Sequence, residues 1–178
     1  MPPEYEAKVL DISPDAVAAR IADLSGQQVA GPIVQRRYVY DIAAGDATRW
    51  IRLRDAGGKV TLATKHIAHD GIDGTFEVEV GVDDFAAANE LLRTLGFVPK
   101  SYQENRRTSF LLDGVQLEID EWPLIPPYLE IEGPSAVDVH RVAAVLGYDE
   151  SQLTSENTTK IYRRYGIELA DHSELRLE

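Results

Sequence analysis

The sequence predicts an α+β fold in which about eight antiparallel β-strands close into a barrel and helices pack on its outside. Segments with period-two hydrophobicity are short and numerous, and few helical segments lie between them. Turn signals such as Ala56-Gly57-Gly58 and Asp113-Gly114 join neighbouring segments as hairpins. Closing the sheet removes exposed strand edges, which favours a barrel; an open α+β sheet is the alternative.

The expected strands follow the alternation of apolar residues with charged or polar ones. They lie near residues 3–12, 34–43, 48–55, 59–66, 75–82, 101–112, 115–122 and 128–133.

The expected helices are marked by their ends as well as by an apolar face. Ser13-Pro14 places a capping residue before a proline at the first helical position, and Gly26 ends this helix. Further helices are expected over residues 83–95, 135–146 and 154–165.

The composition indicates a soluble globular chain that needs no more than one domain. Of its 178 residues, 44% are hydrophobic and 27% are charged, and no apolar run approaches the roughly 20 residues of a membrane span. The first residues lack a secretory pattern and there are no cysteines, so we expect a cytoplasmic location without a membrane partner. The net charge of −12 argues against nucleic acid as a partner.

Each expected strand has one charged face and one apolar face, because successive side chains point to opposite sides. Glu4, Glu6 and Lys8 share one face of the first strand, and Arg52 and Arg54 share one face of another. A solvated face of a half-buried sheet explains any one strand alone. It does not explain why helices, which need an apolar surface, accompany strands that carry charges of both signs. We therefore expect the charges to point inward, into a polar tunnel.

The charges inside such a tunnel must be compensated by opposite charges, because burying an unpaired charge costs several kcal/mol. Carboxylates facing arginines and lysines suit a divalent cation on one wall and a polyanion on the other. Oxygen ligands favour magnesium or manganese over zinc, and the chain has no cysteine. The histidines lack metal-ligand spacing and are expected at the surface: His66, His69, His140 and His172.

Charged motifs recur in order along nearly the whole chain. They are Glu4-x-Glu6-x-Lys8, Tyr40-Asp41, Trp50-Ile51-Arg52-Leu53-Arg54, Thr61-Leu62-Ala63-Thr64-Lys65, Glu77-x-Glu79, Arg106-Arg107, Glu118-x-Asp120 and Glu130-x-Glu132. This series resembles the CYTH family, also called triphosphate tunnel metalloenzymes, and implies a single CYTH domain over residues 1–178. The family includes class IV adenylate cyclases, thiamine triphosphatases and inorganic tripolyphosphatases, which all use a metal and a triphosphate-containing substrate.

The resemblance also implies roles for individual residues. Phosphate oxygens would be bound by Arg52, Arg54, Lys65 and one member of the pair Arg106-Arg107. Metal would be bound by Glu4, Glu6, Glu130 and Glu132. Asp120 would orient a basic neighbour or supply a metal ligand, and Glu77 and Glu79 would support a second ion.

Two assignments stay open at this point. Arg106 and Arg107 point to opposite faces of a regular strand, so only one reaches the substrate; we favour Arg106. Lys8 is a candidate for activating water if surrounding cations lower its pKa, and it is otherwise a phosphate ligand.

We expect a metal-dependent hydrolase of a small triphosphate, either inorganic tripolyphosphate or an organic or nucleoside triphosphate. A class IV-type adenylate cyclase that converts ATP to cyclic AMP and pyrophosphate is the alternative, because the same charged residues would serve it. A further alternative is a non-catalytic module that binds polyphosphate or a nucleotide. The sequence leaves open whether the chain forms a homodimer.

Overall fold

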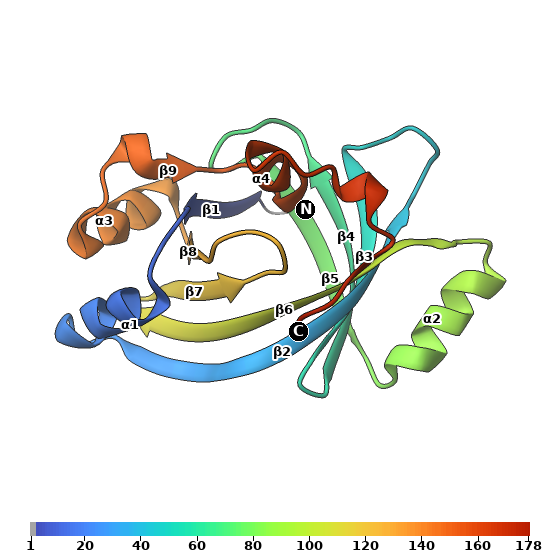
Figure 1. Ribbon diagram of the computed structural model, residues 1–178, viewed down its shortest axis with the longest axis horizontal. Coiled ribbons are helices and arrows are strands. Elements are labelled where there is room, and N and C mark those ends of the chain that lie inside the picture. The colour runs from blue at the N-terminus through green and yellow to red at the C-terminus, as the bar shows by residue number, and fades with distance from the viewer. Residues whose placement is uncertain (1–2) are drawn as a thin grey trace.

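The protein forms a closed antiparallel barrel of eight strands, seen here in a computed structural model that describes residues 3–178 (Figure 1). The order around the barrel is β6-β2-β3-β4-β5-β1-β8-β7, and the pairing of β7 with β6 closes it. The predicted barrel is confirmed. The strands are β1 (Pro3–Val9), β2 (Gln27–Asp41), β3 (Arg49–Ala56), β4 (Lys59–Ile67), β5 (Thr75–Val82), β6 (Pro99–Leu112), β7 (Val115–Glu121) and β8 (Tyr128–Gly133).

Strand β2 begins seven residues earlier than the sequence pattern indicated. Gly31 and Pro32 interrupt the alternation there, and the pairing of β2 with β6 shifts register between Ala30 and Ile33. A glycine and a proline inside a strand are typical of such irregular positions, which hide the strand from a period-two search.

Two further strands are too short to carry a periodic signal. Strand β9 (Leu153–Thr154) pairs with β1, and β10 (Glu174–Leu175) runs parallel to β6. Both lie outside the barrel circuit.

Four helices occupy the expected segments within a few residues: α1 (Pro14–Asp23), α2 (Phe85–Thr94), α3 (Ala136–Leu146) and α4 (Thr158–Arg164). Asp84 and Ser135 cap α2 and α3 by accepting hydrogen bonds from backbone N–H groups. Ser13 stands at the N-cap of α1, but its side chain makes no capping hydrogen bond, and Pro14 alone marks that start. None of the described helices combines the length and apolar character needed to cross a membrane.

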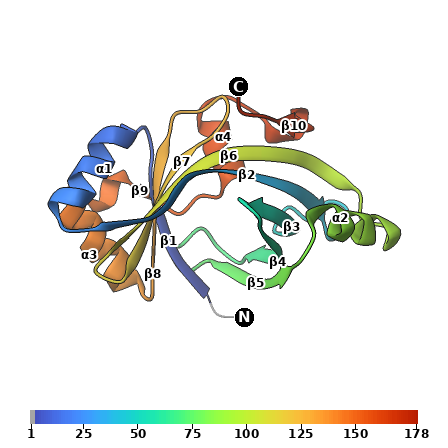
Figure 2. The ribbon, with the colours of Figure 1, turned by 90° about the horizontal axis from the view of Figure 1, so that it is seen from below.

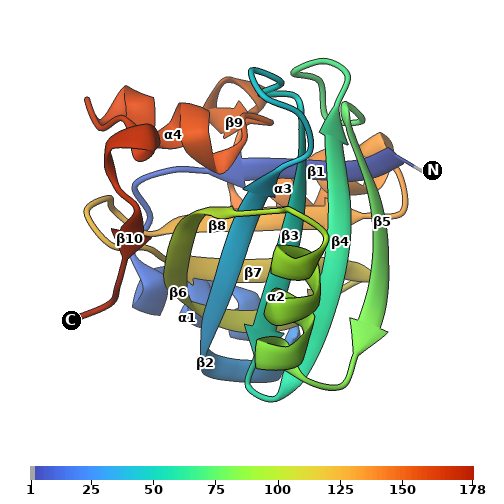
Figure 3. The same ribbon diagram turned by 90° about the vertical axis from the view of Figure 1, so that its right-hand side faces the viewer.

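The helices lie outside the barrel, and α1, α2 and α3 cover the apolar strand faces (Figures 1 and 2). Helix α4 instead contributes Thr158 and Thr159 to the lining of the interior. Helices α1 and α3 pack on one side, where Leu117, Leu129 and Ile131 are fully buried in a common core. Helix α2 covers β3 on another side, where Leu53 is buried (Figure 3). Since the apolar faces point outward to the helices, the charged faces of the same strands are left to line the interior.

Candidate active site

The inner faces of the strands enclose a cavity of about 1240 Å³, here called the barrel cavity. Its lining includes ten of the twelve site residues proposed from the sequence: Glu4, Glu6, Lys8, Arg52, Arg54, Lys65, Glu77, Glu79, Glu130 and Glu132. These residues come from strands β1, β3, β4, β5 and β8. The expected inward orientation of their charges is therefore confirmed by the geometry.

One wall of the cavity, formed by β1 and β8, is rich in carboxylates. Glu6 lies opposite Glu132 in the strand register, and Lys8 lies opposite Glu130. Burial raises the pKa of Glu132, and the neighbouring carboxylates of Glu130 and Glu6 raise it further. Within residues 3–178, Glu132 forms no ion pair. A carboxylate group that is short of positive charge is a suitable place for a cation.

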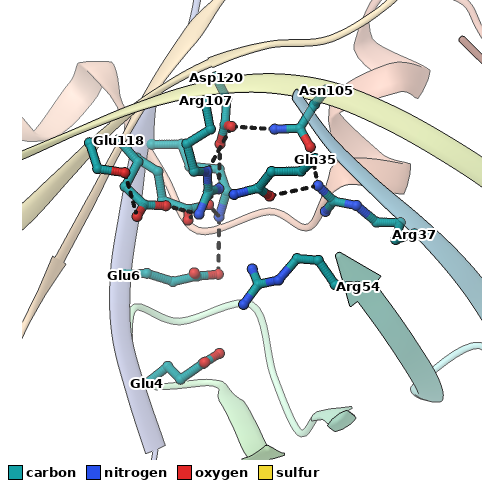
Figure 4. A network of polar contacts seen from close by, with 12 residues as sticks. Glu4, Glu6, Gln35, Arg37, Arg54, Asn105, Arg107, Glu118 and Asp120 are labelled. Carbon is teal, nitrogen blue, oxygen red and sulfur yellow. Dashed lines mark hydrogen bonds and ion pairs between the residues drawn. The ribbon is translucent and has the colours of Figure 1, made fainter. Parts of the chain in front are cut away.

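The opposing side of the cavity carries arginines from β3. Figure 4 shows Arg54 extending toward Glu6 across the interior. Burial and the guanidinium groups of Arg52 and Arg107 lower the pKa of Arg54 to about 10, so it is still protonated at neutral pH. Like charges held together in a cavity favour the binding of an anion.

Glu77 and Glu79 are engaged by basic side chains. Arg52 Nη2 lies 2.6 Å from Glu77 Oε1 and 2.9 Å from Glu79 Oε2, and Arg54 Nη2 lies 3.1 Å from Glu79 Oε2. Lys65 Nζ lies 2.8 Å from Glu77 Oε2. These contacts favour a role in compensating the basic residues over the expected second metal site.

Glu4 belongs to the carboxylate-rich strand β1 but pairs with a basic residue of β4. Lys65 Nζ lies 2.9 Å from Glu4 Oε2. Burial and the nearby carboxylate of Glu77 raise the pKa of Glu4, while Lys65 lowers it less. Glu4 is therefore a weaker candidate for a metal ligand than Glu132, because the carboxylate of Glu4 already shares the Lys65 cation with Glu77.

The expectation that Arg106 faces the interior is wrong. Arg106 is 40% exposed and pairs with Glu121 outside the cavity, at 3.5 Å, whereas Arg107 lines the cavity. The reason is the hairpin at Asp113-Gly114, which places Arg107 directly opposite Asp120. Residues opposite one another in an antiparallel pair share a face, so counting across this turn would have identified Arg107 from the sequence.

Asp120 lies on the inner face of β7 but is fully buried in its contacts with Arg107, so it is not itself part of the cavity lining. Both of its oxygens accept hydrogen bonds from Arg107, with Nε–Oδ1 at 2.9 Å and Nη2–Oδ2 at 2.5 Å. Of its two proposed roles, orienting a basic neighbour is the one that this geometry favours.

Carboxylate oxygens of Glu118, Asp120 and Glu130 nevertheless lie within 4.8 Å of one another, a spacing that could hold a metal ion. Arg107 contacts all three carboxylates here.

Lys8 is almost fully buried between two carboxylates. Its Nζ lies 3.0 Å from Glu6 Oε1 and 3.3 Å from Glu130 Oε2. Burial alone would lower the pKa of Lys8, but these two charges outweigh it and raise the pKa above its usual value. The condition for Lys8 to act as a base, a lowered pKa, is not met in this arrangement.

Several lining residues were absent from the sequence-based site. Glu118 was part of a recognised motif, and its side chain lines the cavity beside Arg107. Arg37 and Gln35 project inward from β2, and period two along that strand could have revealed them, because Tyr38 and Tyr40 pack on the outer side.

The donor set fits a hard divalent cation. Glu6, Glu118, Glu130 and Glu132 offer carboxylate oxygens around one part of the cavity, and no histidine lines it within the described part of the chain. Oxygen ligands of this kind suit magnesium or manganese.

The fold and the site together define the class of protein: a closed antiparallel barrel whose interior carries charges of both signs. The CYTH domain model matches residues 2–165, and the chain belongs to the CYTH family. A search of curated proteins finds no match.

Solved structures share the fold at low sequence identity. A conserved hypothetical protein from Pyrococcus furiosus is 23% identical with a TM-score of 0.74, covering 87% of this chain and 97% of that one. A putative adenylate cyclase from Vibrio parahaemolyticus is 12% identical with a TM-score of 0.77, covering 91% and 98%. A putative adenylyl cyclase from Hippeastrum, described as having a dominant triphosphatase activity, is 20% identical with a TM-score of 0.61, covering 97% and 100%.

Proposed function

We propose that the protein is a divalent-metal-dependent hydrolase of triphosphate-containing compounds. The observation that carries the proposal is the opposition of two walls in one cavity. Carboxylates on β1 and β8 include Glu132, which forms no ion pair within residues 3–178, and guanidinium groups on β3 and β6 repel one another. A metal-bound oligophosphate would satisfy both walls, because the cation meets the carboxylates and the phosphate oxygens meet the arginines.

The residues of each wall would take separate roles. Glu6, Glu118, Glu130 and Glu132 would hold magnesium or manganese, which supplies neutralisation of the phosphate oxygens. Arg52, Arg54 and Arg107 would align the phosphate chain and stabilise the charge that develops on its oxygens during transfer to water.

Lys8 would contribute as a cation rather than as a base. Its ion pairs with Glu6 and Glu130 hold the ammonium group between two carboxylates of the wall. A protonated lysine in this position can donate hydrogen bonds to a phosphate oxygen.

An adenylate cyclase is the second candidate, because the cavity is large and its lining is not made of charged residues alone. Beside the charged residues, the lining includes Trp50, Ser101 and Gln103, which offer an aromatic ring and neutral hydrogen-bonding groups. These side chains could receive the organic part of a nucleoside triphosphate. The structural resemblance to a putative adenylate cyclase supports this candidate at the level of the fold alone.

Product analysis separates the candidates. The protein is incubated with tripolyphosphate, ATP or thiamine triphosphate in the presence of magnesium or manganese. Hydrolysis predicts orthophosphate from tripolyphosphate at a rate at least equal to the consumption of ATP, since only water can attack a substrate without a ribose. Cyclic AMP with pyrophosphate from ATP, and intact tripolyphosphate, would establish the cyclase instead. Binding of all three compounds without any product would leave a non-catalytic binding module.

A further inference from the structure

Arg37 is a buried cation that none of the sequence motifs included. It lies on β2, is 7% exposed, and lines the barrel cavity. Its guanidinium group stands near those of Arg52, Arg107 and Arg54. Burial together with these three charges lowers the pKa of Arg37 to about 9, and the carboxylate of Asp120 offsets only part of this shift. Even so, Arg37 carries its positive charge at neutral pH.

The direct partners of Arg37 are all neutral. Its Nη2 donates hydrogen bonds to Gln35 Oε1, at 3.1 Å, and to Asn105 Oδ1. The guanidinium carbon lies 4.6 Å from the centre of the Trp122 ring. In the part of the chain from residue 3 onward, no carboxylate forms an ion pair with Arg37, and its Nε has no hydrogen-bond partner.

A buried guanidinium without a carboxylate is costly, because no opposite charge repays its desolvation. Arg52, Arg54 and Arg107 each have acidic partners that line the cavity, so Arg37 differs from them in this respect. Because no carboxylate within residues 3–178 pairs directly with Arg37, we expect an anion to complete its environment when the cavity is filled.

Asn105 holds Arg37 in place. It is fully buried, accepts from Arg37, and donates from Nδ2 to Asp120 Oδ1 at 2.6 Å. Asp120 in turn binds Arg107, so one chain of contacts joins two guanidinium groups of the cavity (Figure 4). The amide oxygen of Asn105 accepts a hydrogen bond from Arg37 without neutralising its charge.

We infer that Arg37 is a further ligand of the oligophosphate anion and that Asn105 is the positioning residue that presents it. This inference rests on the proposed function, because it uses the same cavity and the same class of substrate. Arg37 adds a charge-assisted contact to those of Arg52, Arg54 and Arg107, and neutral partners keep its charge available for the substrate.

Binding of a non-hydrolysable analogue tests the inference without requiring turnover. Calorimetric titration with imidotriphosphate and magnesium compares the wild type with Arg37→Met, Arg37→Lys and the control Arg106→Met. We expect the Kd to rise at least about tenfold for Arg37→Met and less for Arg37→Lys, which keeps the charge but loses the planar fork. Arg106→Met, on the outer side of β6, should change the Kd by less than about twofold.

Thermal unfolding of the unliganded variants gives a second readout. Arg37→Met removes a charge that neighbouring guanidinium groups repel, so its Tm should equal or exceed that of the wild type while its affinity falls. A purely structural arginine would lower the Tm and leave the affinity of the folded protein unchanged. Should Arg37→Met fail to fold, the Kd of Arg37→Lys decides: a wild-type value overturns the inference.

A double-variant cycle tests the role of Asn105. Asn105→Leu should weaken imidotriphosphate binding, and it should cause a smaller loss in the Arg37→Met background than in the wild type, because the contact between Asn105 and Arg37 is already gone there. Any loss that acts through Asp120 and Arg107 is the same in both backgrounds. Additive losses would overturn the assignment of Asn105 as the residue that presents Arg37.

The outcomes also distinguish this inference from the proposed function. If the wild type binds imidotriphosphate and Arg37→Met binds it equally well, the inference fails and the proposed function stands. If the wild type does not bind the analogue at all, the proposed function fails and the inference falls with it.

Discussion

Arg107 and Asp120 form a two-point ion pair across strands β6 and β7, with Nε–Oδ1 at 2.9 Å and Nη2–Oδ2 at 2.5 Å. Asp120 is fully buried, whereas Arg107 reaches the barrel cavity. The pair therefore connects the wall of the barrel to its interior, and it fixes the direction of one cationic group.

Asp120→Asn should destabilise the fold, because it leaves Arg107 short of one buried partner charge. Removing one partner of a buried ion pair costs about 3–5 kcal/mol, and we expect the free energy of unfolding to fall by about 3 kcal/mol. Urea denaturation measures this change. Glu121→Gln is the matched control, since Glu121 pairs with Arg106 at an exposed position and should cost less than about 1 kcal/mol. Equal losses for both variants would contradict the structural role of Asp120.

Arg52→Ala and Arg54→Ala should each weaken binding or turnover of a triphosphate while the fold is retained. Loss of a charge-assisted contact is worth about 1.5–3 kcal/mol, or about ten- to a hundredfold in kcat/KM. Steady-state kinetics with tripolyphosphate measures the effect, and Arg106→Ala serves as the control on the outer face. Wild-type kinetics for both cavity variants would exclude these arginines from the phosphate site.

Removal of divalent metal should abolish turnover. Without a cation, Glu6, Glu130 and Glu132 raise the electrostatic energy of one wall of the cavity, and the phosphate oxygens lack their counter-charge there. Phosphate release is measured in EDTA and again after magnesium or manganese is added in excess, which should restore it. Full activity in metal-free buffer would remove the central claim of the proposed function.

Lys8→Met should lower kcat more than it changes KM. The raised pKa of Lys8 keeps the ammonium group charged, so it can stabilise charge that grows on the phosphate during transfer. We expect kcat to fall by about ten- to a hundredfold. The exposed Lys160→Met is a control, because Lys160 pairs with Asp70 outside the cavity. A higher KM with an unchanged kcat would show that Lys8 contributes to substrate binding alone.

The closed barrel could be predicted from local patterns in the sequence. Alternation along each strand separated an apolar face from a charged one, and helices with an apolar stripe required the apolar faces on the outside. The inward charges of Glu6, Arg52 and Glu130 follow from this argument, and the barrel cavity contains all three.

The sequence by itself thus determined the fold and most of the charged residues of the cavity, because both depend on periodicity within single strands. Tertiary structure decided how those charges are distributed among partners. The register of a hairpin placed Arg107, and not Arg106, in the cavity. The pKa of Lys8 is raised by Glu6 on its own strand and also by Glu130, which tertiary structure brings from another strand. Among the residues that the structure describes, the arrangement of strands gave Arg37 neutral hydrogen-bond partners and no ion pair with a carboxylate. Partner choice depends on distances between segments far apart in the chain, and no local pattern encodes those distances.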